Sequence, residues 1–356
     1  MPARGSKQHG YIMKLFVSPH HELHATERHP LPIGAAVLEQ PVRIDNILNG
    51  LRRIGEPDPS EVRDLGGSVI ARVHPDHYLR FLRTAYETEH SRNPERNWVE
   101  IENIAPRVVR YHSKHFDLQK GLYLTDTFTQ IFAHTFEAAY WAAQASANAA
   151  EALSLGFSCA YALVRPPGHH AYAQQAGGFC FLNNAAIAAR QLQQHPNFRR
   201  IAILDVDFHH GNGTQEIFYS DPAVFFCSLH GHPDFAYPFV SGLESERGEE
   251  AGEGSNLNVC LPEGTGSAQY IAALEGALER VRDYKPDALI VSLGFDTAEG
   301  DPYGKFEVTP EGFFDIGDLL RSFGRPTVLI QEGGYLLNRL AENSESFFRG
   351  FLASGA

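Results

Sequence analysis

The chain has 356 residues, and 43% of them are hydrophobic, which is enough to bury the core of a large α/β domain. Its 30 lysines and arginines are outnumbered by 43 acidic residues. The formal net charge of -13 argues against a general affinity for nucleic-acid phosphates and suits a cationic substrate. No apolar run approaches the ~20 residues of a membrane helix, so we expect neither a nucleic-acid nor a membrane partner.

Residues 1–12 lack the apolar segment of a signal peptide, and the first plausible strand, MKLFVS, begins at Met13. We interpret residues 1–12 as an N-terminal extension and expect a cytoplasmic protein. Four cysteines lie far apart, without a CxxC pair and mostly in apolar surroundings. Buried free thiols in a reducing compartment are therefore expected for Cys159, Cys180, Cys227 and Cys260.

Helices and long loops are predicted for the first 150 residues after the initial strand. The segment HHELHATERHPLPIGAAVLEQP is rich in His, Pro and charged residues, which is typical of a loop. Apolar residues at helical spacing predict helices over residues 42–55, 74–88 and 129–152. The polar residues 89–120 are predicted to be mostly loop.

Strands and helices alternate from residue 157 onward. Apolar runs such as CAYALV, IAILDVDF and DALIVSLGFD predict strands, and helical patterns such as NNAAIAARQLQQH separate them. Such alternation predicts one parallel sheet with helices on both faces. We find no linker that would divide the chain into two folded units.

Acidic and histidine residues gather directly after the apolar run Ile201–Leu204. Asp205, Asp207 and His209 occupy alternate positions, so in an extended chain they project to one side. Two carboxylates and an imidazole at a buried strand end repel one another unless a cation neutralises them. Oxygen and nitrogen ligands without a thiolate suit zinc in an open catalytic site, with other first-row metals possible. A simple polar turn is the alternative, which so many ionisable groups disfavour.

Polar residues also follow three further strands, and ligands of open α/β sheets bind beyond the carboxyl ends of the strands. They are Arg165–His170, Asp296 and Glu332–Tyr335. Asp296 would supply a third ligand beside Asp207 and His209 and leave positions open for water and substrate. Taken alone, Asp296 could instead be a helix cap.

The adjacent His169 and His170 follow RPPG, whose prolines stiffen the loop so that both imidazoles can be aimed. A carboxylate partner raises the pKa of a histidine more than an amide partner does. With Asp205 holding one ring and Asn212 the other, we expect His169 to be cationic and His170 to act as general base and then acid. An exposed histidine pair is the alternative for this motif alone.

Three aromatic residues are candidates for the substrate site. Tyr335, after EGG, could donate its hydroxyl to a developing oxyanion. Phe179 and Tyr237 could form apolar walls, although plain core packing accounts for each of the three rings nearly as well.

Together the motifs RPPGHH, GGFCFLNN, DVDFHHGNGT, SLH, SLGFD and EGGY resemble the zinc-dependent histone deacetylase superfamily over residues 14–352. The segment GLYLTDTFTQIFAHTFEAAYWAA and the long early loop resemble its bacterial acetylpolyamine amidohydrolases more than the eukaryotic protein deacetylases. The resemblance implies a single-domain, three-layer arginase/deacetylase-type α/β fold over residues 13–356, with an eight-stranded parallel sheet.

The resemblance also implies a role for individual residues. One Zn²⁺ would be held by Asp207, His209 and Asp296, and the catalytic residues would be His169, His170, Asp205, Asn212 and Tyr335. A structural K⁺ or Na⁺ would lie among Asp205, Asp207, His209, Ser228 and Leu229. Substrate would contact Gly178, Phe179 and Tyr237, the acids Asp117 and Glu27 would attract a distal ammonium, and Arg43 would lie beside an acetate exit channel.

In the polyamine enzymes that this chain resembles, a homodimer narrows the mouth of the substrate tunnel, and we expect a dimer through residues 19–40 and 85–115. Two features depart from those enzymes. Phe128 occupies the position of a third acid, and GDPYGKFEVT (300–309) resembles the broader deacetylase group.

The sequence thus predicts a zinc-dependent hydrolase of linear amide bonds that deacetylates acetylated polyamines or similar small acetylated amines. Protein acyl-lysine deacetylation is the alternative. A non-catalytic protein that binds acyl-amines is less favoured because every ligand, both histidines and the tyrosine are present. A manganese ureohydrolase would require more Asp and His ligands than DVDFHHGNG provides.

Overall fold

The computed structural model describes residues 13–26, 38–55, 58–99, 101, 104 and 114–353. Within that part of the chain, seven strands form one parallel sheet in the order β1-β2-β7-β6-β3-β4-β5. The strands are β1 (Met13–Val17), β2 (Cys159–Leu163), β3 (Ile201–Asp205), β4 (Val224–Gly231), β5 (Asn256–Leu261), β6 (Ala288–Leu293) and β7 (Thr327–Gln331).

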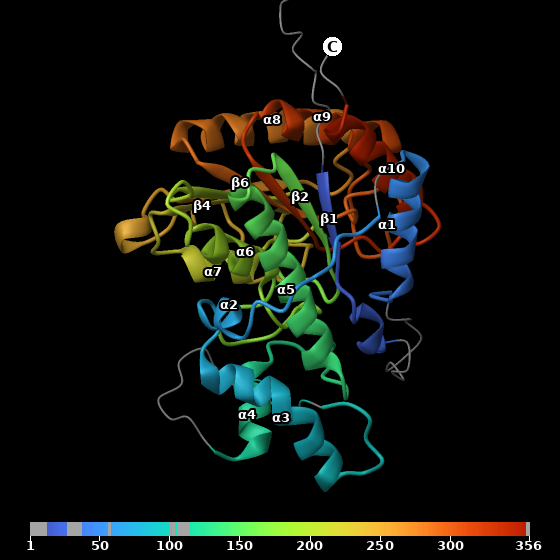
Figure 1. Ribbon diagram of the computed structural model, residues 1–356, viewed down its shortest axis with the longest axis vertical. Helices are drawn as coiled ribbons and strands as arrows, with labels where there is room; N and C mark the ends of the chain where they lie inside the picture. The colour runs from blue at the N-terminus through green and yellow to red at the C-terminus, as the bar shows by residue number, and fades with distance from the viewer. Residues whose placement is uncertain are drawn as a thin grey trace, which may run out of the picture.

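Helices surround this sheet (Figure 1). In the described residues they are α1 (Val42–Arg53), α2 (Ser68–Ala71), α3 (Asp76–Arg92), α4 (Phe116–Tyr123), α5 (Thr135–Ser154), α6 (Asn184–Leu192), α7 (Asn212–Phe218), α8 (Ser267–Tyr284), α9 (Pro310–Ser322) and α10 (Leu340–Phe351). Two short 3₁₀ segments cover His21–Leu23 and Glu250–Gly252. Across the described ranges, no helix combines the length and the apolar composition needed to span a bilayer.

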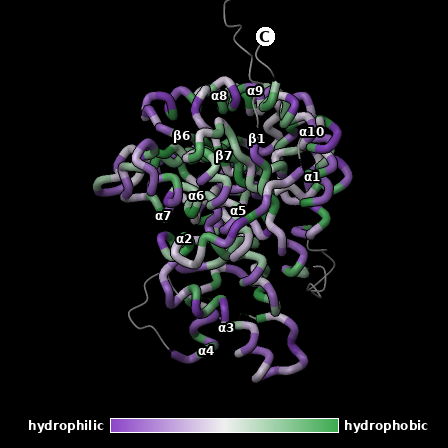
Figure 2. Tube along the Cα trace, viewed as in Figure 1, coloured by the Kyte–Doolittle hydropathy of each residue, from purple (hydrophilic) through white to green (hydrophobic). Residues whose placement is uncertain are grey.

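Two apolar layers cover the sheet because alternate residues of a strand point to opposite faces. Ala202 and Leu204 of β3 join the cluster that contains α1, α8, α9 and α10, whereas Ile201 and Ile203 join the cluster that contains α5 and α6. Figure 2 shows the hydrophobic trace concentrated around the strands, with hydrophilic trace on the outer turns. A sheet covered on both faces explains why its inner strands are continuous apolar runs.

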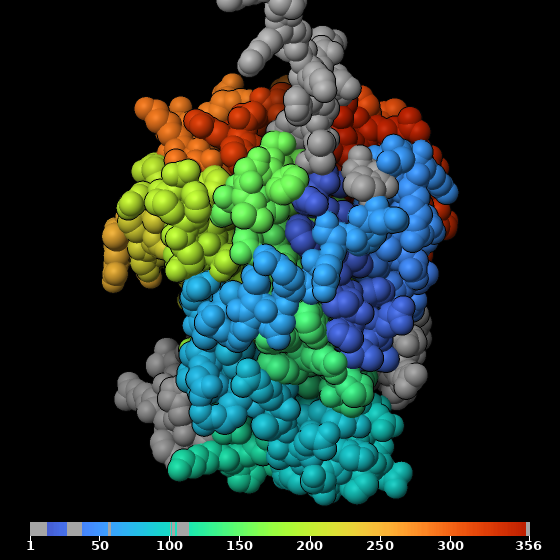
Figure 3. Space-filling view, in the orientation of Figure 1, coloured from blue at the N-terminus to red at the C-terminus, as the bar shows by residue number. Residues whose placement is uncertain are grey.

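Helices α1 and α10 pack side by side although they come from opposite ends of the chain (Figure 3). Gly50 of α1 allows this approach, because a Cβ atom there would lie 2.2 Å from Ser344 Oγ and 2.6 Å from Ala341 O of α10. The N-terminal helix therefore closes the same face of the sheet as the C-terminal one.

The prediction of eight strands is wrong, because the described residues form seven. On its outer side, the edge strand β1 gains one isolated pairing within the described ranges, in which Ser60 N donates to Leu15 O at 2.7 Å. Pro59 lies directly before Ser60, and its ring fixes φ at about -65°, whereas a parallel strand has φ of about -120°. The segment beside β1 therefore does not continue as a strand. The extra strand came from the family resemblance, while the apolar runs themselves indicate the observed number.

A lobe built from α3 and α4 extends from the end of the molecule opposite α8 and α9 (Figure 1). Its core is a third apolar cluster that includes Tyr78, Phe81 and Tyr123. Part of the predicted loop 89–120 is helical, since α3 continues to Arg92 and α4 begins at Phe116. The long alanine-rich helix begins at Thr135, six residues later than predicted from the sequence.

Candidate active site

Four chain segments meet at the carboxyl end of the sheet because β2, β7, β6 and β3 are neighbours. They contribute, respectively, Arg165–His170, Glu332–Tyr335, Asp296 and Asp205–His210. Sequence patterns predict the four strand ends but not the order of the strands. The observed order brings all four polar segments into one place.

Asp207, His209 and Asp296 form a compact set in which one ligand atom from each lies within 4.8 Å of the others. His209 Nδ1 is 2.9 Å from Asp296 Oδ2 and 3.2 Å from Asp207 Oδ1, and both carboxylates are fully buried. Burial and the charge of Asp207 raise the pKa of Asp296 to about 7. Asp207 thus opposes the ionisation of Asp296, and a cation bound between the two buried carboxylates would offset that repulsion.

Two glycines shape the space around these carboxylates. A Cβ atom on Gly294 would lie 2.2 Å from Asp207 Oδ2, and one on Gly333 would lie 2.3 Å from Asp296 Oδ2. Gly333 N also donates to Asp207 Oδ2 at 2.8 Å, and Phe208 N donates to Asp296 Oδ1 at 2.9 Å. Backbone amides thus orient both carboxylates, and the oxygen and nitrogen donor set fits a zinc ion.

The histidine pair lies beside this set, with ring centroids 4.0 Å apart. His169 Nδ1 donates to Asp205 Oδ2 at 2.9 Å, and His170 Nδ1 donates to Asn212 Oδ1 at 2.6 Å. Because Nδ1 of His170 carries the proton in that bond, Nε2 keeps a free lone pair. These are the two partners that the sequence predicts.

The surroundings of the two rings give His169 and His170 different charges. Burial lowers the pKa of His169, but Asp205 and Asp207 outweigh it and raise that pKa to about 10. Burial, followed by the charges of His169 and His209, holds the pKa of His170 well below its usual 6.5. At neutral pH His169 is therefore cationic and His170 is a neutral base.

Tyr335 is 5% exposed and lies on the same side of the sheet end. Its backbone N donates to Asp301 Oδ2 at 2.7 Å, and the Arg43 guanidinium lies 4.8 Å from its ring centroid. Burial raises the pKa of Tyr335 well above 10, although Arg43 opposes this shift. The hydroxyl therefore stays protonated and can donate a hydrogen bond.

A cavity of about 390 Å³ opens over these residues. Gly178, Phe179 and Tyr237 line it, as the sequence predicts, together with Phe128 and Tyr303. Of the described residues, its lining contains no Asp or Glu, and Lys305 lies among the lining residues. The wall is therefore aromatic rather than acidic.

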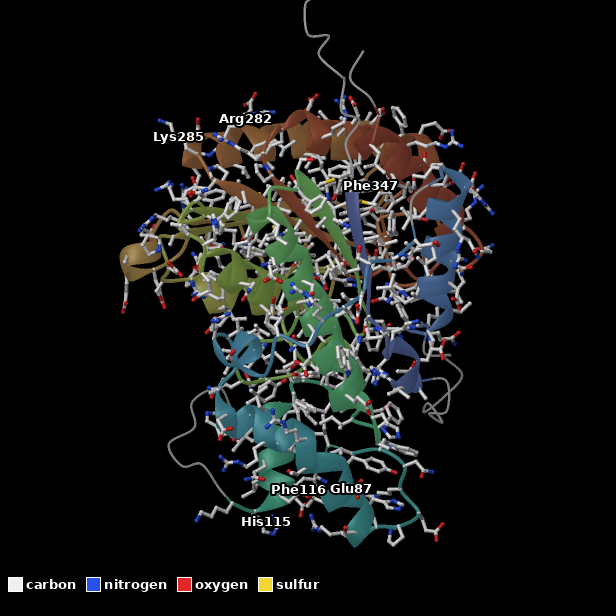
Figure 4. The ribbon with its side chains drawn as sticks, viewed as in Figure 1. Glu87, His115, Phe116, Arg282, Lys285 and Phe347 are labelled. Carbon is white, nitrogen blue, oxygen red and sulfur yellow. The ribbon has the colours of Figure 1, made fainter. Side chains whose placement is uncertain are left out.

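Asp117 lies apart from this cavity, on α4 in the lobe. Arg92 donates to both of its carboxylate oxygens at 2.7 and 2.9 Å, and Lys120 Nζ lies 3.3 Å away. These cations, Arg92 first, hold the pKa of Asp117 well below its usual value. Figure 4 shows its chain neighbours His115 and Phe116 near the far end of the lobe. Within one chain the structure does not bring this acid to the cavity.

Several other predicted residues fall outside the part of the chain that the structure describes. They are residues 1–12, Glu27 and portions of both predicted dimer segments, 19–40 and 85–115.

The residues proposed for a monovalent cation lie on neighbouring strands. Asp205 of β3 is paired with Ser228 of β4, and Leu229 follows Ser228 along β4. Asp205 Oδ1 accepts from Asp207 N at 3.1 Å, while Ser228 Oγ lies 2.8 Å from His230 Nδ1. The members of this set on β3 and β4 are therefore neighbours in the sheet.

Arg43 is 1% exposed and bonded on several sides. It pairs with Glu39 Oε1 at 3.0 Å and donates to the backbone oxygens of Glu332 at 2.5 Å and Gly334 at 2.7 Å. It therefore holds the backbone on both sides of Gly333, whose Cα lies close to the carboxylates of Asp207 and Asp296.

Sequence reasoning missed the roles of three buried carboxylates. Glu332 Oε2 accepts from Gly168 N at 2.7 Å and from His169 N at 3.1 Å. Asp301 accepts from the backbone N of Tyr335. Glu39 pairs with Arg43 and with Arg165 Nε, the latter at 2.8 Å. The available signal for Glu332 was a charged residue directly after an apolar strand. No comparable local pattern marks Asp301 or Glu39.

A parallel α/β sheet whose strand ends hold a buried Asp-His-Asp set that could bind a metal ion, beside a histidine pair, is an arrangement typical of hydrolases. Residues 37–351 match the histone deacetylase domain family. The chain belongs to this family, which confirms the resemblance seen in the sequence.

Within the family, the chain is similar to proteins named as polyamine enzymes. It is 44% identical to an acetylpolyamine amidohydrolase of Burkholderia pseudomallei over 84% of this chain and 85% of that one. It is 36% identical to acetylpolyamine amidohydrolase 2 of Pseudomonas aeruginosa over 95% and 98% of the two chains. A crystal structure of the acetylpolyamine aminohydrolase from Burkholderia pseudomallei superimposes with a TM-score of 0.89 at 40% identity and covers 96% of this chain and 99% of that chain.

Proposed function

We propose that this protein is a zinc-dependent deacetylase that hydrolyses the amide of acetylated polyamines or similar small acetylated amines. The observation that carries this proposal is the buried set Asp207, His209 and Asp296 beside a neutral His170 and a protonated Tyr335, at the floor of an aromatic cavity. The names of its relatives support the choice of substrate.

Each residue then has a chemical task. Asp207, His209 and Asp296 would hold a zinc ion, which would supply Lewis acidity toward the amide carbonyl and favour ionisation of water. His170 accepts the proton of the attacking water at Nε2, because Asn212 holds its Nδ1 proton, and returns it to the leaving amine. Cationic His169 stabilises developing negative charge, and the Tyr335 hydroxyl donates to the carbonyl oxygen.

A monovalent cation, K⁺ or Na⁺, is proposed beside the metal set. Asp205, Ser228 and the backbone around Asp207, His209 and Leu229 provide hard oxygen atoms at neighbouring strand positions. A cation there would offset the charge of Asp205 without replacing its bond to His169.

Protein acyl-lysine deacetylation is the second candidate function. The described lining of the cavity holds no carboxylate that would attract the distal ammonium of a polyamine, and it holds Lys305. Phe128 and Tyr303 occupy the two positions at which the sequence departs from polyamine enzymes, and both line the cavity. This observation favours a substrate without a second positive charge.

We expect kcat/KM of the zinc-loaded enzyme to be higher for acetylputrescine and acetylcadaverine than for a peptide containing acetyl-lysine. The assay compares the three substrates at equal enzyme and metal concentration. A preference for the peptide would replace the first candidate by the second. No turnover of any of them would contradict deacetylation of acetylated amines altogether.

We also expect a cytoplasmic homodimer that forms through residues 19–40 and 85–115 and supplies acidic groups, such as Asp117 and Glu27, to the mouth of a neighbouring cavity. Sedimentation of the purified protein at micromolar concentration tests this expectation. A monomeric species at that concentration would contradict it.

A further inference from the structure

Asp126, in the loop between α4 and α5, is 8% exposed and lies directly behind the aromatic cavity. Its Oδ1 accepts from the backbone N of Phe128 at 3.0 Å and of Thr129 at 2.7 Å. These two bonds close the loop on itself.

The second carboxylate oxygen of Asp126 reaches two other segments of the chain. Oδ2 accepts from Gly178 N at 2.7 Å and from the Tyr237 hydroxyl at 3.1 Å, in addition to the Thr129 hydroxyl at 3.0 Å. A carboxylate has about four lone-pair sites, and five donors already point at this one. Asp126 therefore has no acceptor capacity left for a substrate.

The backbone of Phe179 needs such an anchor. Gly178 has φ 56° and Phe179 has φ 67°, and the left-handed region is unfavourable for a residue with a side chain. Phe179 N donates to Thr129 Oγ1 at 2.9 Å, and that hydroxyl in turn donates to Asp126. A strained backbone of this kind persists only where neighbouring hydrogen bonds hold it. Here those hydrogen bonds lead to the carboxylate of Asp126, directly from Gly178 N and through the Thr129 hydroxyl from Phe179 N.

The rings of Phe179 and Tyr237 pack against the catalytic residues Tyr335 and His170. The Phe179 ring centroid lies 6.3 Å from that of Tyr335, and the Tyr237 ring packs edge-on against His170 at 4.8 Å. Phe128 contacts both walls, at 5.7 and 5.8 Å. The spacing between Phe179 and Tyr237 therefore depends on how both are tied to Asp126.

We infer that Asp126 is a positioning residue that fixes the spacing of the Phe179 and Tyr237 walls and thereby favours slim, unbranched acylated amines. This inference rests on the proposed deacetylase function and adds the residue that sets its substrate selectivity. Asp126 acts through the two walls and does not touch the substrate.

The test replaces Asp126 by asparagine, which keeps the size of the side chain but removes acceptor capacity. We compare kcat/KM for acetylputrescine with that for N-acetylbenzylamine, whose ring lies directly beside the amide. In Asp126→Asn the ratio of the two values should fall by about tenfold, chiefly through a higher KM for acetylputrescine, with unchanged zinc content and kcat pH profile. An equal loss for both substrates, or an unchanged ratio, would overturn the inference.

Asp64 provides a matched control. Like Asp126, it accepts a tyrosine hydroxyl, from Tyr140 at 2.6 Å, and a glycine amide, from Gly66 at 2.8 Å, but it is exposed and distant in the fold from the cavity. Asp64→Asn should leave the substrate ratio unchanged. A fall in the ratio equal to that of Asp126→Asn would assign the effect to general destabilisation and overturn the inference.

Two milder variants test the network bond by bond. Tyr237→Phe and Thr129→Val each remove one hydroxyl. Each should lower the ratio of kcat/KM for acetylputrescine to that for N-acetylbenzylamine, as Asp126→Asn does. Both variants remain informative even if Asp126→Asn does not fold. In a double-mutant cycle, Tyr237→Phe added to Asp126→Asn should cost less than the sum of the single changes, because both remove the same bond. Full additivity would contradict the shared anchor.

Amide hydrogen exchange separates this inference from the proposed function. Loss of the carboxylate should speed exchange at the amides of Gly178 and Phe179, also in metal-free protein, where no turnover occurs. If the wild-type enzyme cleaves neither substrate, the proposed function fails while exchange still tests the anchor. Unchanged exchange at both amides would overturn the anchor even if the enzyme is an active deacetylase.

Discussion

Asp207→Ala is expected to abolish both zinc binding and turnover. Its carboxylate supplies one of three ligand positions, and its removal leaves only His209 and Asp296. Two ligands do not hold zinc in a site of this kind, which uses three protein groups and leaves one position open. Zinc content by elemental analysis and the rate of acetylputrescine hydrolysis are the two measurements.

The control for this variant is Asp287→Ala. Asp287 precedes β6 and accepts from the backbone N of Arg199 and Arg200, each at 2.8 Å, at the end of the sheet opposite the site. It should retain zinc and activity. Activity in wild-type protein stripped of metal would refute the metal requirement, whereas zinc retained by Asp207→Ala would refute this choice of ligands.

Buried carboxylates hold the loops of this site in place through hydrogen bonds. Glu332 holds the loop of the histidine pair, Asp301 holds the backbone of Tyr335, and Asp126 holds the aromatic walls. All three accept bonds from backbone amides, which are rigid donors. Catalytic groups on loops are thus fixed before substrate arrives, and the cost of ordering them is already met in folding.

The sequence predicts much of this arrangement because the relevant signals are local. An apolar run identifies β3, and the acids and histidine that follow it are predicted at its carboxyl end, although the strand itself ends at Asp205 and does not extend through Asp207 and His209. Family resemblance adds the monovalent-cation set and the exit-channel residue Arg43 to the residues that these patterns indicate. It also carried over an eighth strand, for which the chain has no apolar run.

Other features depend on contacts between distant parts of the chain. Asp126 reaches Tyr237, 111 residues away, and Arg43 reaches the carbonyl of Glu332, 289 residues away. No periodicity encodes such bonds. Asp117 shows the same dependence: resemblance assigns it to a substrate, and within one chain Arg92 of α3 and Lys120 of α4 pair with it. Electrostatic partners within the lobe cannot be read from the motif alone.

Tyr335→Phe is expected to lower kcat by on the order of 10²–10³-fold, because it removes a hydrogen-bond donor to charge that develops on the carbonyl oxygen. The ring stays in place, since Asp301 holds the backbone N at 2.7 Å and Arg43 lies over the ring face. Zinc content and KM should therefore change little, so that the loss falls on kcat. An unchanged kcat would remove Tyr335 from this role.

The pH profile of kcat gives a second test of Tyr335. Burial holds the pKa of its hydroxyl well above 10, so the donor is present throughout the range below pH 10 and is lost only above it. The wild-type enzyme and Tyr335→Phe should therefore share the same profile below pH 10, displaced to lower rate in the variant. A basic limb near neutral pH that disappears in Tyr335→Phe would show that the hydroxyl ionises during catalysis, and it would contradict a role as a permanent donor.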